Sequence, residues 1–173
     1  MSFRPSARGI AAMALLAIAW PRALPGQSVA QRIAAAPDGR VQFTYATREG
    51  VCGDGQSFVH VGDSGGNQFY GSFNDLSSEP CVHGPARVVV DRMSGQVVGL
   101  RVYVGPPAHD GTRDLGAVGV REAAGYLLGL AASGEGAVSR DAILPAMLAD
   151  SVDNQSALVA LARDQTRSRE TRR

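Results

Sequence analysis

The hydrophobic periodicity of the chain changes once, near residue 115, and this change constrains the fold more than any other feature. Between residues 41 and 104, short segments alternate apolar and polar residues, which is typical of half-buried strands. From Val120 onward, apolar residues recur at i, i+3, i+4 and i+7, which is typical of amphipathic helices. Strands followed by helices predict an α+β fold.

The first half of the chain contains five segments with strand patterning. They cover residues 41–46, 57–62, 68–73, 86–92 and 96–104. Ser94 and Gly95 lie between the last two segments and predict a tight hairpin. Short strands joined by local turns predict a small antiparallel sheet of about five strands. One face of the last strand is expected to carry Val98, Leu100, Val102 and Val104.

The second half begins after a loop expected at residues 105–116. Three or so short amphipathic helices follow, over residues 120–131, 141–150 and 154–164. The domain organisation expected is therefore a β region over residues 40–116 and a helical region over residues 117–173.

The first thirty residues have the three-part pattern of a secretory signal peptide. Two arginines precede an apolar run at residues 10–20, and small residues lead to a cut expected between Ala30 and Gln31. The apolar run is shorter than the roughly 20 residues that span a bilayer. We therefore expect an exported protein, periplasmic or extracellular, with no stable membrane insertion after signal removal and with residues 31–39 as a linker.

The charge of the mature chain argues against a nucleic-acid partner. Removal of residues 1–30 takes away three of the 17 basic residues and none of the 16 acidic residues, so the formal charge becomes −2. Proteins that bind the phosphate backbone carry a basic surface instead.

Cys52 and Cys81 are the two cysteines of the chain. In an exported protein, such a pair predicts a disulfide. The bond would close a loop of about 30 residues and stabilise the fold by roughly 3–4 kcal/mol. The alternative is a zinc site that also uses His60 and His83, although these spacings differ from those of zinc fingers.

Two glycine-rich stretches resemble catalytic or phosphate-binding loops. Residues 62–66 read GDSGG, as around the nucleophile of chymotrypsin-like proteases, but His60 is the one upstream histidine, and the two barrels of that fold do not fit before it. Residues 53–55 read GDG, yet the chain lacks the lysine that a P-loop requires. Both stretches therefore predict turns, and no catalytic residue or cofactor is expected.

Two further sets of residues remain as alternatives. His109, Asp110 and Asp114 are candidates for a metal site in a small exported hydrolase, although polar residues beside Pro and Gly are more typical of a solvated turn. The other set would make the β region a module that binds a small ligand between aromatic side chains, namely Tyr45, Phe69, Tyr70 and Tyr103.

The helical region resembles a HEAT-type repeat. REAAGYLLGLA, RDAILPAMLADS and NQSALVALARDQTRSRETRR give short helices with polar linkers, and in the last segment Ser168 resembles the cap of a following helix. As a whole the chain resembles exported bacterial HEAT-repeat proteins with a cysteine-containing β region. The resemblance implies a non-enzymatic interaction or scaffold protein with a protein partner.

The HEAT resemblance leaves two interpretations of the C-terminal residues. A HEAT array needs at least three repeats to bury a continuous core, so we expect a shortened member of the family or part of a longer chain. Alternatively, the last residues form a frayed basic tail, and residues 118–164 pack on the sheet as one α+β domain.

Overall fold

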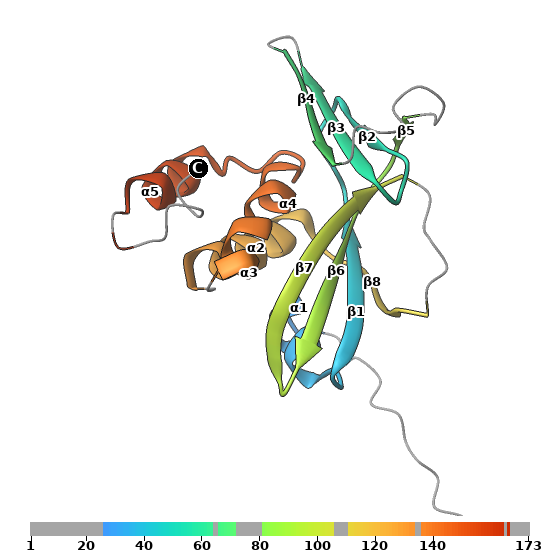
Figure 1. The fold of residues 1–173 in the computed structure, drawn as a ribbon, viewed down its shortest axis with the longest axis vertical. Helices are drawn as coiled ribbons and strands as arrows, with labels where there is room; N and C mark the ends of the chain where they lie inside the picture. Colours follow the sequence, from blue (N-terminus) through green and yellow to red (C-terminus); the bar gives the residue numbers. More distant parts are fainter. Residues whose placement is uncertain are drawn as a thin grey trace, which may run out of the picture.

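The computed structural model describes residues 26–63, 66–71, 81–105, 111–133, 136–164 and 166 (Figure 1). Within these residues it confirms the α+β class, with eight strands and five helices. The strands are divided between two four-stranded sheets, whereas the sequence predicted a single antiparallel sheet of about five strands.

The longer sheet combines strands from both ends of the β region. Its order is β7–β6–β1–β8, with the bounds Gln96–Val104, Ala86–Met93, Gly39–Tyr45 and Arg113–Ala117. β6 pairs antiparallel with β7 and with β1, whereas β8 pairs parallel with β1. The expectation that residues 105–116 form a loop is therefore wrong for residues 113–116. Residues 113–117 show no clear alternation of apolar and polar residues, and they form a strand because they pair with β1.

The second sheet has the order β4–β3–β2–β5, with the bounds Gly66–Gly71, Phe58–Asp63, Val51–Gly53 and Val82–His83. β2 and β5 were not predicted, because three and two residues are too few to show a period of two. This sheet lies at the end of the longer sheet where β7 finishes (Figure 1). Its position brings a second wall close to the C-terminal half of β7.

A β-bulge in β7 changes which of its side chains face the core. Asp91 pairs with Gly99 and Arg92 pairs with Val97, so Val98 is the extra residue and has no cross-strand partner. Val98 is 46% exposed, whereas Leu100 is 3% exposed. The expectation that Val98 shares the core face with Leu100 is wrong because the bulge reverses the alternation between them.

The predicted hairpin between β6 and β7 is confirmed. Ser94 and Gly95 both have positive φ, at 53° and 78°, as the two central residues of a type I′ turn require. The carboxylate of Asp38 accepts hydrogen bonds from the backbone N–H groups of Ser94 (2.7 Å) and Gly95 (3.0 Å). The segment before β1 therefore holds this turn in place.

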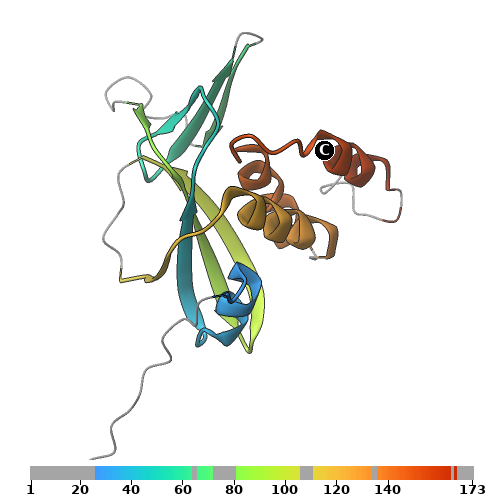
Figure 2. The ribbon, with the colours of Figure 1, turned by 180° about the vertical axis from the view of Figure 1, so that it is seen from behind.

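The segment expected to be a linker begins as a helix. α1 (Val29–Ala35) has Ser28 as its N-cap, and Ser28 and Gln31 form a capping box. Val29 is 1% exposed in the core, and α1 lies at the end of the longer sheet opposite the second sheet (Figure 2). The linker interpretation is thus wrong for residues 31–35, because the apolar face of α1 is buried. The cut expected between Ala30 and Gln31 falls inside α1, and residues 1–25 of the predicted signal peptide lie outside the described residues.

We expect a chain that starts at Gln31 to be about 3 kcal/mol less stable than one that starts at Gly26. The shorter chain loses the buried Val29 side chain, worth roughly 2 kcal/mol, and the Ser28 cap, worth about 1 kcal/mol. It also loses the hydrogen bond from Val29 N–H to the Glu122 carboxylate. Urea unfolding of the two chains measures the difference, and equal midpoints would show that residues 26–30 contribute nothing to stability.

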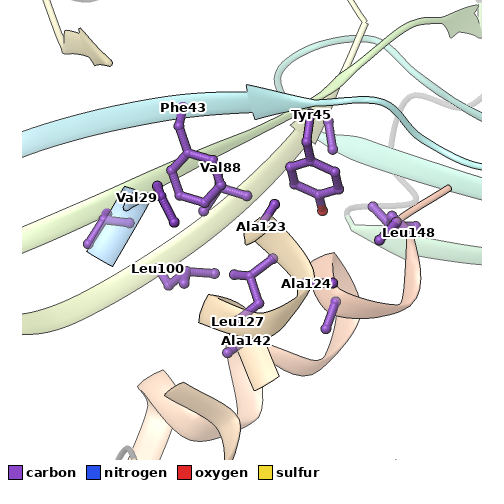
Figure 3. Close-up of a cluster of buried hydrophobic side chains, with 14 of the residues drawn as sticks. Val29, Phe43, Tyr45, Val88, Leu100, Ala123, Ala124, Leu127, Ala142 and Leu148 are labelled. Atoms are coloured by element: carbon purple, nitrogen blue, oxygen red, sulfur yellow. The ribbon is translucent and has the colours of Figure 1, made fainter. Parts of the chain in front are cut away.

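Three helices pack on one face of the longer sheet. They are α2 (Val120–Ser133), α3 (Gly136–Asp141) and α4 (Ile143–Met147). Phe43, Val88 and Leu100 from three neighbouring strands point toward Leu127 of α2 (Figure 3), and all four side chains are fully or almost fully buried. The Tyr45 hydroxyl donates to the Pro145 carbonyl and so connects β1 to α4. α2, α3 and α4 therefore share one core with the sheet.

α5 (Gln155–Arg163) follows this layer and contacts α2. Although its sequence is amphipathic, none of its residues is fully buried. Among the described residues, no helix combines the length and the apolar character needed to cross a membrane.

Candidate functional site

Glycines bring the second sheet into contact with the end of β7. A Cβ on Gly53 would lie 2.4 Å from the Val104 carbonyl oxygen, and one on Gly105 would lie 2.7 Å from the Gly53 carbonyl oxygen. Gly55 N–H donates to the same Val104 oxygen at 2.8 Å. Backbones approach this closely only where side chains are absent. The glycines at 53, 55 and 105 therefore serve the junction between the two sheets.

The GDG stretch binds its own carboxylate rather than a phosphate. Asp54 Oδ1 accepts hydrogen bonds from the backbone N–H groups of Gln56 (2.9 Å), Ser57 (2.8 Å) and Phe58 (3.1 Å), and Oδ2 accepts from the Ser57 hydroxyl. Burial raises the pKa of Asp54, but these hydrogen bonds outweigh it and lower the pKa from 3.8 to about 2. The turn predicted here is confirmed, and the donors that an anion would need are occupied.

We expect Asp54→Asn to lower the free energy of unfolding by about 1 kcal/mol at pH 7, after allowance for solvent screening. Because the folded-state pKa is depressed, this stabilisation is present above about pH 4 and is lost as the pH falls through about 2. The two proteins should converge below that pH. Urea unfolding at pH 7, 4 and 2 measures the trend, and a difference that does not change with pH would contradict this account. Asp114→Asn is the control, since Asp114 accepts one backbone N–H, from Gly116.

Arg87 attaches the Asp54 turn to the outer face of the longer sheet. Its side chain is 5% exposed, and Nη2 donates to the Gly55 carbonyl at 2.8 Å. The guanidinium lies 4.6 Å from the centre of the Tyr103 ring, a cation–π distance. Arg87 thus fixes residues 55–57 beside β7.

The space between the two sheets and the helices α3 and α4 is a cleft of about 580 Å³. We call it the β7 cleft. Its walls are mostly apolar, with two arginines and one aspartate among them. The lining residues come from residues 56–59, Tyr70 of β4, residues 100–103 of β7, Arg140, Asp141, Ile143, Leu144 and Met147. Its volume lies within the range of roughly 300–1,000 Å³ typical of ligand sites.

The β7 cleft exposes a strand edge as well as side chains. β7 is the edge strand of its sheet, and four consecutive residues, 100–103, line the cleft. Side chains of consecutive strand residues point to opposite faces, so a wall built from all four runs along the edge of the strand. Edge strands carry backbone N–H and C=O groups that can pair with another strand.

The four aromatic residues proposed as a ligand site are only partly brought together. Tyr70 and Tyr103 line the β7 cleft. Tyr45 belongs to the core, where burial raises the pKa of its hydroxyl, and the prediction that it lines a site is wrong because its ring faces α2 and α4. The side chain of Phe69 lies outside the described residues.

The predicted disulfide between Cys52 and Cys81 is confirmed. Cys52 pairs across β2 and β3 with His60 and across β2 and β5 with His83. One ligand atom each from Cys52, His60 and Cys81 lies within 4.8 Å of the others, as the zinc alternative requires. In the disulfide, however, neither sulfur is the thiolate that binds zinc. His83 Nδ1 instead donates to the Val51 carbonyl at 2.9 Å.

The hydrolase candidates are not assembled by the described residues. Asp114 is exposed, and its Oδ1 accepts from Gly116 N–H at 2.7 Å, which is turn chemistry. His109 and Asp110 lie outside the described residues. The GDSGG stretch joins β3 to β4 with Asp63 paired to Gly66, so it connects two strands as the turn prediction expected.

Comparison of the chain with protein-family models, with curated proteins and with solved structures finds no match. The β7 cleft was missed by sequence reasoning because its walls come from residues more than 80 positions apart, such as Val59 and Met147. The pattern that bears on it is the apolar stretch of β7 itself, which sequence reasoning assigned to the core.

Proposed function

We propose that the protein is an exported, non-enzymatic interaction protein that binds an extended segment of a protein partner in the β7 cleft. The observation that carries the proposal is the edge of β7, which lines an apolar cleft with four consecutive residues. An extended peptide added to a sheet edge gains affinity from backbone hydrogen bonds and specificity from pockets for alternate side chains.

The bulge in β7 supports this assignment. It lies at residues 97–99, outside the cleft, and a bulge prevents the edge on which it lies from pairing indiscriminately with other strands. Residues 100–103 lack that protection and instead face the helices across the cleft. The edge of β7 is thus interrupted by the bulge at residues 97–99. It is regular at residues 100–103, where the cleft restricts access to it.

The side chains of the cleft fit an apolar segment. Val102 on β7 and Ile143, Leu144 and Met147 on α4 line the cleft, and each of them is partly exposed. Methionine is frequent at peptide-binding surfaces because its unbranched side chain adapts to different partners. Arg101 and Arg140 also line the cleft and are each paired with an aspartate, which gives a polar rim around an apolar centre.

Export and the HEAT-type character of the helices are part of the same proposal. Export is supported by the signal-peptide pattern and by the disulfide, which persists in oxidising compartments. The HEAT-type assignment is supported by α5, whose apolar residues Ala157 and Leu161 line a groove with Leu128 of α2. In a repeat array such a face would be covered by further helices.

The experiment is a selection from a display library of unstructured peptides, followed by affinity measurement on two matched variants. Met147→Glu places a charge in the cleft, whereas Met93→Glu places the same charge at a position that is 62% exposed on the β6–β7 hairpin. We expect Met147→Glu to weaken the selected peptides at least tenfold and Met93→Glu to leave them unchanged. Equal affinities for both variants would place the peptide site elsewhere.

A small apolar ligand is the second candidate occupant, because the cleft volume and the rings of Tyr70 and Tyr103 suit one. The same pair of variants distinguishes the occupants. A small-ligand site predicts that the library yields no peptide that is sensitive to Met147→Glu, while aromatic fragments shift the amide resonances of β7.

A further inference from the structure

The disulfide lies in asymmetric surroundings. Cys52 is 5% exposed in β2, between β3 and β5. Cys81 is exposed and precedes the two-residue strand β5. An external reagent can therefore reach Cys81 more readily than Cys52. Access is one of the factors that decide which sulfur of a disulfide is attacked.

The two sulfurs also differ because the imidazole of His60 lies beside the sulfur of Cys52. His60 Nδ1 lies 3.6 Å from Cys52 Sγ, because the two residues are directly opposite each other in the β2–β3 pair. His83 is opposite Cys52 on the other side, but its Nδ1 donates to the Val51 carbonyl. An imidazole or imidazolium next to a sulfur stabilises a thiolate at that sulfur.

We propose that the disulfide is a site of thiol exchange, in which an external thiolate attacks Cys81 Sγ and Cys52 departs as the thiolate beside His60. A new S–S bond forms between the external sulfur and Cys81, and the Cys52–Cys81 bond breaks. Its electron pair stays on Cys52 Sγ, which either remains a thiolate or takes a proton from His60 or from water. The external thiol gives up its proton to solvent, and no net oxidation or reduction occurs.

The two asymmetries act in the same direction. Exchange is faster when the attacked sulfur is accessible and when the leaving thiolate is stabilised. Here Cys81 is the exposed residue, and the imidazole of His60 lies beside the sulfur of Cys52. The alternative, attack on Cys52, would meet a buried residue. The inference does not depend on the β7 cleft.

The exchange would change the second sheet locally. β5 pairs with β2 over two residues, and the disulfide adds the covalent connection between them. Thr47 Oγ1 still donates to the Gly84 carbonyl at 2.8 Å, so the chain after β5 keeps a contact with the segment that follows β1. The product is a folded protein with an adduct on an exposed edge.

The first test uses the native full chain without denaturant and glutathione as the small thiol. The reaction is quenched with an alkylating agent, and mass spectrometry of peptides identifies the group on each cysteine. We expect glutathione on Cys81 and the alkyl group on Cys52 in the first product formed. Glutathione found first on Cys52, or on both cysteines equally, would overturn the proposal.

A parallel arm uses thioredoxin that lacks its resolving cysteine, and its cross-link is mapped in the same way. If the cross-link to thioredoxin forms on Cys81 faster than the glutathione adduct does, a protein thiol is the favoured source of the attacking thiolate. The opposite order identifies a small thiol as the source. A cross-link through Cys52 would overturn the proposal in this arm too.

The role of His60 is tested with a matched pair of variants. His60→Gln removes the imidazole beside Cys52, and His83→Gln removes the one on the opposite strand. We expect the exchange rate to fall about tenfold for His60→Gln, as for the loss of a hydrogen bond to a departing thiolate, and to stay unchanged for His83→Gln. Equal rates for both variants would show that His60 does not assist the departure of Cys52.

Discussion

Gly53→Ala is expected to lower the free energy of unfolding by about 3 kcal/mol or more. The added Cβ would lie 2.4 Å from the Val104 carbonyl oxygen and 2.6 Å from the Phe58 carbonyl oxygen. Both are backbone atoms of paired strands, so neither can rotate away as a side chain can. The substitution must therefore separate the second sheet from the end of β7 and widen the β7 cleft.

Chemical denaturation of the purified variants measures this effect, and Gly125→Ala is the matched control. Gly125 lies on the exposed side of α2, where a Cβ meets nothing within 4 Å. Alanine there should stabilise the protein by roughly 0.5–1 kcal/mol, because glycine is a poor helix former. Two variants of equal stability would show that the close approach at Gly53 does not constrain the fold.

Removal of the disulfide should have an effect of similar size. The bond joins residues 29 positions apart, and a loop of that length predicts a loss of roughly 3–4 kcal/mol for Cys52→Ala with Cys81→Ala. The loss arises mainly in the unfolded chain, which gains conformational freedom when the cross-link is absent. Fully reduced wild-type protein should unfold at nearly the same denaturant concentration as the double variant.

The comparison between reduced and oxidised wild-type protein isolates the cross-link from the change of side chain. If both forms unfold together, the cross-link adds nothing to stability. If only the double variant is destabilised, the loss comes from packing around the buried Cys52 side chain rather than from the loop.

Long segments with a clear period were predictable from the sequence. β6, β7 and α2 were placed within about two residues, since eight or more residues show their periodicity. The I′ hairpin was predictable because a glycine after a small polar residue fits the turn that positive φ requires.

Short strands, and elements whose existence depends on tertiary contacts, were not predictable from the sequence. β2, β5 and β8 are strands of five residues or fewer, and their existence depends on neighbours supplied by distant segments. α1 was hidden because its residues continue the small and apolar composition of the predicted signal peptide. The helix is stabilised by the burial of Val29, and the composition of the segment does not predict that burial.

The candidate site also has features that the sequence predicts and features that depend on tertiary contacts. The disulfide was predictable because the chain has two cysteines and its first thirty residues have the pattern of a signal peptide, which together predict one bond. The position of His60 beside Cys52 was not, because it depends on the register between β2 and β3. The β7 cleft depends on how two sheets and two helices meet, and no single segment contains that information.

Amide hydrogen exchange shows whether a partner segment adds to the edge of β7. The measurement compares free protein with protein saturated by a selected peptide. We expect alternate amides of residues 100–103 to exchange at least tenfold more slowly in the complex, while amides of the interior strand β1 change little. A saturated complex in which residues 100–103 exchange as fast as in the free protein would contradict the claim.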